Sequence, residues 1–323
     1  MKIQGSRKNA FYILIAFIII ISVVLLIVLN SLYAKQYPEE PIKMKNLGKS
    51  TQTIDISSLS KKIEQEDIPV YFVHPRLHIS NVEEMIDKMG LSLKREDIVK
   101  DSYIQWSDGE NSFTYDSVQD TVSFQLTRRI SLERGVEAFK NVFQKYLGIQ
   151  HDYVLIKERK NNDGGVTYYA SRTLDGIPVQ FGANYEYSEI LKFNKEGVLE
   201  SGQLLLAEFE KYDLYVPTIT NDELKAYINA KDYPKEHYID SSVLTETLDL
   251  NYLDEAWGEI EGTLEECKAQ DFENIFLYKN SNQGYLLPVV KISANCNVTS
   301  KATVYTVPVT FYVNGVSPDY VTL

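Results

Sequence analysis

The stretch Ser131–Gly148, SLERGVEAFKNVFQKYLG, and the residues that follow it decide the fold. Its apolar residues recur at the spacing of an amphipathic helix, and the stretch ends at a glycine. These apolar residues are Leu132, Val136, Phe139, Val142, Phe143 and Tyr146. Residues 153–174 then hold two strand-like runs, joined by NNDGG, which is typical of a hairpin turn. The sequence predicts a helix that faces an antiparallel sheet, and Gly176 and Pro178 predict a break in that sheet.

Similar units are expected on both sides of this stretch. Before it, Ser80 caps a helix that follows a strand at 68–73, and three short runs within 103–126 form an antiparallel meander. After it, Thr220 and Glu223 form a capping box that begins a third unit, which ends in strands. The predicted fold class is α+β, with an N-terminal transmembrane helix followed by repeated helix-plus-antiparallel-sheet units.

Composition and charge limit the function classes. The 323 residues are 44% hydrophobic, which is enough to bury a core. The 33 Lys and Arg against 45 Asp and Glu give a net charge of −12, which would repel a phosphate backbone. We therefore expect no nucleic-acid partner. The 23 Tyr and 13 Phe, against 2 Trp, favour half-buried sheet surfaces.

An uncharged segment, Asn9–Ala34, predicts a membrane anchor. Within it, Phe11–Leu29 is almost wholly Ile, Leu, Val and Phe, and about 20 such residues span a bilayer as a helix. The alternative is a cleaved signal peptide, whose apolar region is typically about 7–15 residues long. Lys2, Arg7 and Lys8 precede the segment, so the positive-inside rule places the N-terminus in the cytoplasm.

These signals predict six regions along the chain. They are a cytoplasmic stub at 1–10, a transmembrane helix at 11–33, a linker at 34–67, and α+β units at 68–130, 131–215 and 216–323. The expected location is the cell membrane, with a single pass and an extracytoplasmic C-terminal domain. The bilayer itself is then a partner, through residues 11–33.

Several short motifs resemble those of PepSY and YycI-like modules. They are Gly176-Ile177-Pro178-Val179, the turn at Gly197, Glu255-Ala256-Trp257, Gly284-Tyr285-Leu286-Leu287-Pro288-Val289 and Phe311-Tyr312-Val313-Asn314. The layout is also similar to that of anchored envelope proteins of the candidate phyla radiation. The resemblance implies a non-catalytic envelope module, because YycI-like proteins restrain a membrane histidine kinase and PepSY modules are linked to inhibiting peptidases. It carries over no catalytic residue.

The strong catalytic motifs are absent from the sequence: it has no His-Glu-x-x-His helix, Gly-x-Ser-x-Gly elbow or phosphate loop. His74 and His78 could chelate a metal only on a helix, which Pro75 disfavours, so an exposed turn is expected. An acidic run between Glu255 and Glu266 is typical of a solvated helix face. We predict no catalytic residue, metal site or cofactor.

Two further sets of residues are candidates for a role. Cys267 and Cys296 are the only thiols, and they form either a disulfide or two small buried side chains. Four tyrosines on adjacent expected strands form either an interaction face or cross-strand packing pairs. These are Tyr168, Tyr169, Tyr185 and Tyr187.

The function expected from the sequence is a non-catalytic protein–protein interaction or regulatory module of the bacterial cell envelope. Its partner would be an envelope or membrane protein that the sequence does not name. The alternative is a cell-wall hydrolase or a peptidase inhibitor whose site is assembled from scattered residues and shows no motif.

Overall fold

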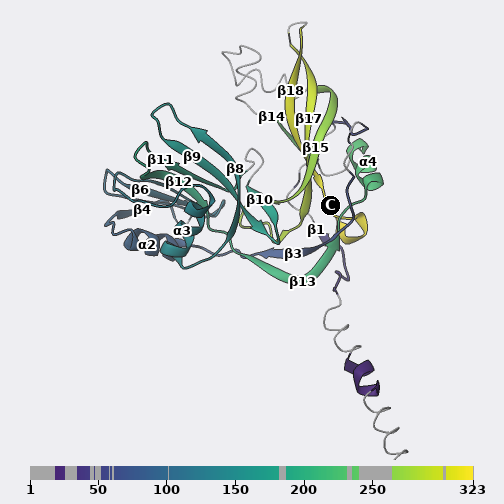
Figure 1. Cartoon of the computed structure of the whole chain (residues 1–323), viewed down its shortest axis with the longest axis horizontal. Helices are drawn as coiled ribbons and strands as arrows, with labels where there is room; N and C mark the ends of the chain where they lie inside the picture. The colour runs from purple at the N-terminus through teal and green to yellow at the C-terminus, as the bar shows by residue number, and fades with distance from the viewer. Residues whose placement is uncertain are drawn as a thin grey trace, which may run out of the picture.

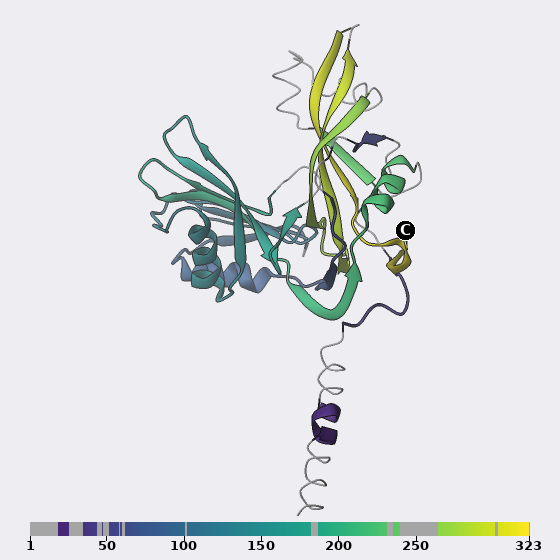
Figure 2. The ribbon, with the colours of Figure 1, turned by 45° about the vertical axis from the view of Figure 1, so that its right-hand side comes forward.

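Strands dominate the structure, which is a computed structural model (Figure 1). It describes residues 19–25, 35–43, 47, 52–57, 59, 62–100, 102–181, 187–230, 235–239, 264–300 and 303–322. Within these residues the strands form one large sheet and two small ones. Figures 1 and 2 show two lobes side by side, with a long strand pair, β3 and β13, running beneath their junction.

The first lobe carries two helices on one face of its strands (Figure 1). Its elements are α2 (Ile79–Lys88), β4 (Lys94–Val99), β5 (Tyr103–Ser107), β6 (Ser112–Asp116), β7 (Thr121–Gln125), α3 (Val136–Leu147), β8 (Asp152–Lys160), β9 (Val166–Leu174), β11 (Glu189–Phe193) and β12 (Leu199–Leu205). The expected meander is confirmed as β5, β6 and β7, and the expected hairpin as β8 and β9. Helix α3 ends at Gly148 in the left-handed conformation, as its sequence predicts.

The core of this lobe lies between the two helices and the sheet. Met85 of α2 and Phe139 and Phe143 of α3 are fully buried in one apolar cluster with Phe113 and Tyr115 of β6. Helix α2 begins after His78, without a side-chain cap, so the expected cap at Ser80 is wrong and that serine lies inside the helix. The apolar spacing therefore located the helix better than the capping signal did.

The second lobe consists of long strands and one helix. Its elements are β2 (Ile54–Asp55), α4 (Asn221–Asn229), β14 (Lys235–Ile239), β15 (Leu264–Tyr278), β17 (Pro288–Ser300) and β18 (Thr303–Asn314). Thr220 and Glu223 form the reciprocal capping box at the start of α4, which confirms that prediction. Glu265 and Glu266 lie in β15, not on a helix, while the rest of the acidic run lies outside the described residues.

Strand β10 (Ile177–Phe181) joins the two lobes into one sheet. It pairs antiparallel with β9 at Ile177 and parallel with β15, where Val179 lies opposite Phe276. Asp175 and Gly176 both have positive φ, which is typical of the two-residue turn of a tight hairpin. The expected break at Gly176 and Pro178 is therefore wrong, because the chain turns there and adds another strand.

The two smaller sheets bring together distant parts of the chain. One contains β13 (Phe209–Pro217), β3 (Asp67–Val73) and β16 (Tyr285–Leu286), in that order. The other pairs β1 (Ile42–Lys43) with β19 (Val321–Thr322), which follows a short 3₁₀ helix at Pro318–Tyr320. Residues near both ends of the described chain thus meet at the base of the second lobe.

The predicted fold class is wrong. Repeated helix-plus-sheet units would each close their own sheet, whereas here β10 and β15 make a single continuous sheet out of strands from both lobes. Strand residues also far outnumber helical residues in the described chain. The pairing of β10 with β15 links residues about a hundred positions apart, which hydrophobic periodicity cannot detect.

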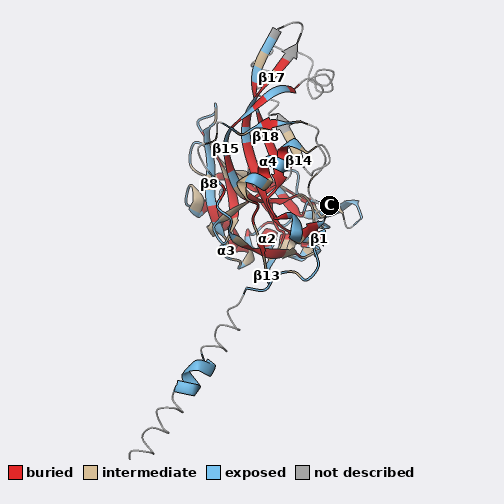
Figure 3. Ribbon diagram, turned by 90° about the vertical axis from the view of Figure 1, so that its right-hand side faces the viewer, coloured by how far each residue is buried: buried red, intermediate tan, exposed pale blue. Residues whose placement is uncertain are grey.

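The predicted N-terminal anchor is also contradicted. Among the residues described here, no helix is long and apolar enough to cross a membrane. Of the predicted span only residues 19–25 are described; they are helical and exposed, as Figure 3 shows, and residues 11–18 and 26–33 lie outside the described residues. This finding overturns the single-pass localisation that was expected from the apolar run.

Candidate functional site

Three aromatic side chains lie close together on one face of the β13–β3–β16 sheet. Figure 1 shows β3 and β13 beneath the junction of the lobes. Phe72 lies in the central strand, directly opposite Tyr285 on one side and Glu210 on the other. Because these residues are in register across the three strands, their side chains form one row on the same face. The Phe72 side chain therefore lies between the Tyr285 ring and the Glu210 carboxylate.

A β-bulge in β13 completes the group. The register of β13 shifts between Lys211 and Tyr215, and this irregular segment carries Tyr212. The Tyr212 ring centroid lies 6.3 Å from that of Phe72 and 6.3 Å from that of Tyr285, and the Phe72 and Tyr285 centroids are 5.7 Å apart. Tyr212 is 42% exposed and Tyr285 is 37% exposed. We call Phe72, Tyr212 and Tyr285 the aromatic platform.

Apolar side chains pack beside the platform on its own face and behind it on the opposite face. Val70, Val216 and Leu287 are buried in one small cluster, and each lies in or beside a strand that also carries a platform residue. Tyr71 points to the opposite face of β3, where its ring packs edge-on against Phe276 at 5.3 Å. With both faces of β3 packed, the rings project from a rigid support rather than from a loop.

Ion pairs lie on both faces of the platform strands. His74 Nε2 lies 2.6 Å from Glu210 Oε2, and the His74 ring also contacts the Phe72 ring edge-on. On the opposite face, beside Tyr71, Lys211 Nζ lies 2.6 Å from Asp175 Oδ2, and its hydrogen bond lowers the pKa of Asp175 below the usual range. Such exposed pairs contribute little to stability, but they fix which charges a partner would meet.

A buried polar cluster lies where α2 begins, beside β6 and the turn before β7. His78 Nδ1 lies 2.8 Å from Asp120 Oδ1, and the Tyr115 hydroxyl donates a hydrogen bond of 2.9 Å to the same oxygen. Burial, reinforced by the charge of Asp120, raises the pKa of Tyr115, which keeps its hydroxyl proton in place as the donor. His78 is 1% exposed, so the expectation that both histidines lie on an exposed turn is wrong for His78.

The chemistry that this cluster can perform depends on the group that faces Nε2 of the His78 imidazole. A carboxylate on Nδ1 also orients the histidine of a hydrolytic triad, whose Nε2 then faces a nucleophile. Here Nε2 of His78 lies 3.5 Å from a second carboxylate, that of Glu208. Arg76 in turn lies 3.4 Å from Glu208. The arrangement is that of an ion-pair network which joins the start of α2 to the start of β13.

A second buried network positions β13. Arg172, in β9, donates hydrogen bonds to the carbonyls of Leu205 and Ala207, and its Nη2 lies 3.3 Å from Glu189 Oε1. Burial raises the pKa of Glu189 to about 7, although Arg172 acts in the opposite direction. Burial, together with the charge of Arg172, lowers the pKa of His151 to about 2. These bonds hold the chain where β12 ends and the platform strand begins.

The predicted interaction face is divided by the strand geometry. Tyr168 is buried and packs edge-on against Phe193, whereas Tyr169, its neighbour on β9, points the other way and contacts Tyr187 at 4.7 Å. Tyr185 lies outside the described residues. Only Tyr169 and Tyr187 are therefore brought together in the described structure.

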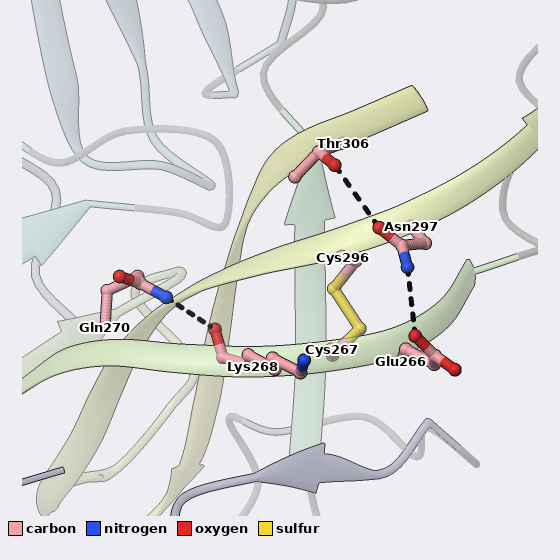
Figure 4. Close-up of a disulfide and its surroundings, with 7 residues drawn as sticks. All are labelled: Glu266, Cys267, Lys268, Gln270, Cys296, Asn297 and Thr306. Carbon is pink, nitrogen blue, oxygen red and sulfur yellow. Dashed lines mark hydrogen bonds between the residues drawn. A yellow bond between two sulfur atoms is a disulfide. The ribbon is translucent and has the colours of Figure 1, made fainter. Parts of the chain in front are cut away.

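The two cysteines form a disulfide between β15 and β17 (Figure 4). A bulge places Glu266, which has a φ of 45°, between the paired residues Glu265 and Lys268, and this extra residue turns Cys267 toward the buried face. Cys267 and Cys296 are 3% and 0% exposed. In the part of the chain that the structure describes, no group of His, Cys, Asp or Glu could hold a metal ion.

The sequence did not reveal the aromatic platform. Its three members come from separate strands, β3, β13 and β16, and each alone is an ordinary aromatic residue of a sheet. One usable signal was FEKYDLYVP, residues 209–217, in which aromatic residues are interleaved with charges on a strand too polar to be buried. Such a strand must expose at least some of its rings.

Comparisons with known proteins give two distant structural likenesses. No protein-family model and no curated protein matches the chain. An uncharacterized protein from Eubacterium rectale is 8% identical, with a TM-score of 0.43, over 80% of this chain and 86% of that one. YycH from Bacillus subtilis is 10% identical, with a TM-score of 0.31, over 76% of this chain and 52% of that one. No family model supports the resemblance to PepSY and YycI-like modules that the short motifs suggested.

Proposed function

We propose that this chain is a non-catalytic protein–protein interaction or regulatory module that binds its partner through the aromatic platform. One observation carries the proposal: Phe72, Tyr212 and Tyr285 form a contiguous, partly exposed group on a rigid sheet. Aromatic residues are enriched in protein interfaces and among the residues that dominate binding energy. Tyrosine also offers a large contact area at a low cost in conformational entropy.

The position of the platform favours a regulatory role. It lies on the strand pair beneath the junction of the lobes, and the buried networks of His78 and Arg172 hold the same strand pair in place. A partner bound there would contact both β3 and β13, so it would stabilise one arrangement of this junction over others. The free energy of binding would thereby be linked to the conformation of the chain.

Site-specific photocrosslinking tests the proposal. A photoreactive amino acid in place of Tyr212 in the full-length chain should crosslink one protein in cells, and excess purified chain should compete for it. Phe72→Ala should abolish that product. The matched control is the same amino acid at Tyr103, which is 40% exposed on β5, a strand of the large sheet and not of the β13–β3–β16 sheet, and it should not give the product.

The competing reading, a hydrolase, predicts different results. A crosslinking pattern that is the same at both positions and insensitive to Phe72→Ala would remove the support for the proposal. Hydrolysis of a glycan or peptide by the purified chain, lost in His78→Gln while the protein remains folded, would establish the hydrolase instead. The His78–Asp120 pair is the observation that makes this second test necessary.

A further inference from the structure

We infer that the partner segment bound by the aromatic platform presents an arginine side chain, stacked on the rings and paired with Glu210. The inference rests on the proposed function and specifies the chemistry of its partner. Three features carry it: an exposed carboxylate with an unshared oxygen, three mutually inclined rings, and an acidic border.

The carboxylate of Glu210 is placed to receive a second cation. Its side chain is 60% exposed, and it lies in the same cross-strand row as Phe72 and Tyr285. Oε2 is 2.6 Å from His74, whereas no donor among the described residues contacts Oε1. A guanidinium can donate to a carboxylate oxygen through one edge while its flat face remains free to stack.

The rings present separate faces and not one flat surface. The planes of Phe72 and Tyr212 are inclined by 49°, those of Phe72 and Tyr285 by 71°, and those of Tyr212 and Tyr285 by 87°. A sugar ring stacks best on one extended aromatic plane, which these angles exclude. Tyr212 and Tyr285 are also partly exposed, and a cation can bind against the face of a single aromatic ring.

The surrounding charge favours the same partner. The β13 side of the platform carries the exposed carboxylates of Glu210 and Asp213, whereas Glu208 is paired with Arg76. Lys211 lies on the opposite face of the sheet, where it is paired with Asp175. The chain as a whole has a net charge of −12. Both the local and the overall field therefore attract a basic segment and repel an acidic one. Arginine is favoured over lysine because its planar group can stack and form directional hydrogen bonds together.

A citrulline-matched peptide pair tests the inference. The probe is a blocked, fluorescein-labelled peptide of alternating arginine and leucine, and its control replaces each arginine with citrulline, which keeps the shape but removes the charge. Fluorescence anisotropy with the full chain at low salt should show binding at least about tenfold tighter for arginine. Glu210→Gln and Tyr212→Ala should each weaken arginine binding by about five- to tenfold. Glu83→Gln, an exposed carboxylate on α2, should leave it unchanged.

The possible results distinguish the arginine inference from the proposed function on which it rests. Equal affinity for the two peptides, arginine binding unaffected by Glu210→Gln, or Tyr212-dependent binding of a neutral glycan would overturn the inference. If the crosslinked partner is lost in Phe72→Ala while the arginine probe ignores Glu210, the proposed function stands and the inference fails. If neither the crosslinked partner nor the arginine peptide depends on the platform residues, both the proposed function and the inference fail. Thermal unfolding of each variant confirms that the chain remains folded.

Discussion

Reducing the Cys267–Cys296 disulfide should destabilise the chain by an amount that follows from its place in the sequence. The two residues are 29 positions apart and close a loop of about 30 residues between neighbouring strands. The loss of chain entropy in an unfolded loop of that length corresponds to about 3.6 kcal/mol at 25 °C. Since the native strands are also held by their ladder hydrogen bonds, reduction should lower the free energy of unfolding without abolishing the fold.

Urea unfolding followed by circular dichroism measures this effect. The oxidised chain should be more stable than the same chain in a phosphine reductant by about 3–4 kcal/mol. The variant Cys267→Ala/Cys296→Ala is the control, and its unfolding curve should not respond to the reductant. An unchanged curve for the native sequence, or two titratable thiols in the folded protein, would refute the reasoning.

Two further predictions concern the lobe junction. Gly176→Val should lower the free energy of unfolding by about 1–3 kcal/mol, because a β-branched residue is strained at the φ of 81° found there. Gly176→Asn should lower it less. Equal melting temperatures for the two variants would contradict this prediction. The pKa of Glu189 is raised on folding from 4.5 to about 7, so its contribution to stability is fully present below about pH 4.5 and is lost as the pH rises through 7. Unfolding free energies should fall by about 2–3 kcal/mol between pH 5 and 8, and Glu189→Gln should flatten that profile; parallel profiles for the two proteins would reject the assignment.

Local signals in the sequence predicted local structure well. The glycine at 148 ends α3, and Thr220 and Glu223 cap α4, because both signals act through backbone groups within one helical turn. The turn Asp175-Gly176 was a hairpin signal of the same kind, but the proline two residues later suggested a break. The actual outcome depended on β15, a strand far along the chain that accepts β10 as a parallel neighbour.

The candidate site depended almost wholly on non-local pairing. Phe72, Tyr212 and Tyr285 become neighbours only because β3 pairs with both β13 and β16. Likewise, His78 is buried in contact with Asp120, and strands β5 and β6 of the meander separate the two residues in the sequence. No spacing rule relates them. Sequence patterns describe the faces of single elements, and they do not specify which elements meet.

The strand register has a consequence for the order in which the chain can fold during synthesis. Ile42 of β1 lies opposite Val321 of β19, and β3 needs β16, whose residues emerge more than two hundred positions after it. The helix-bearing lobe can close early, because its meander and hairpins are local. Strand β3 can pair with β13 earlier, but β1 and the β16 side of β3 must wait, with apolar residues uncovered, until the last strands leave the ribosome. A nascent chain stalled before residue 285 would thus hold one finished lobe and an aggregation-prone leading segment.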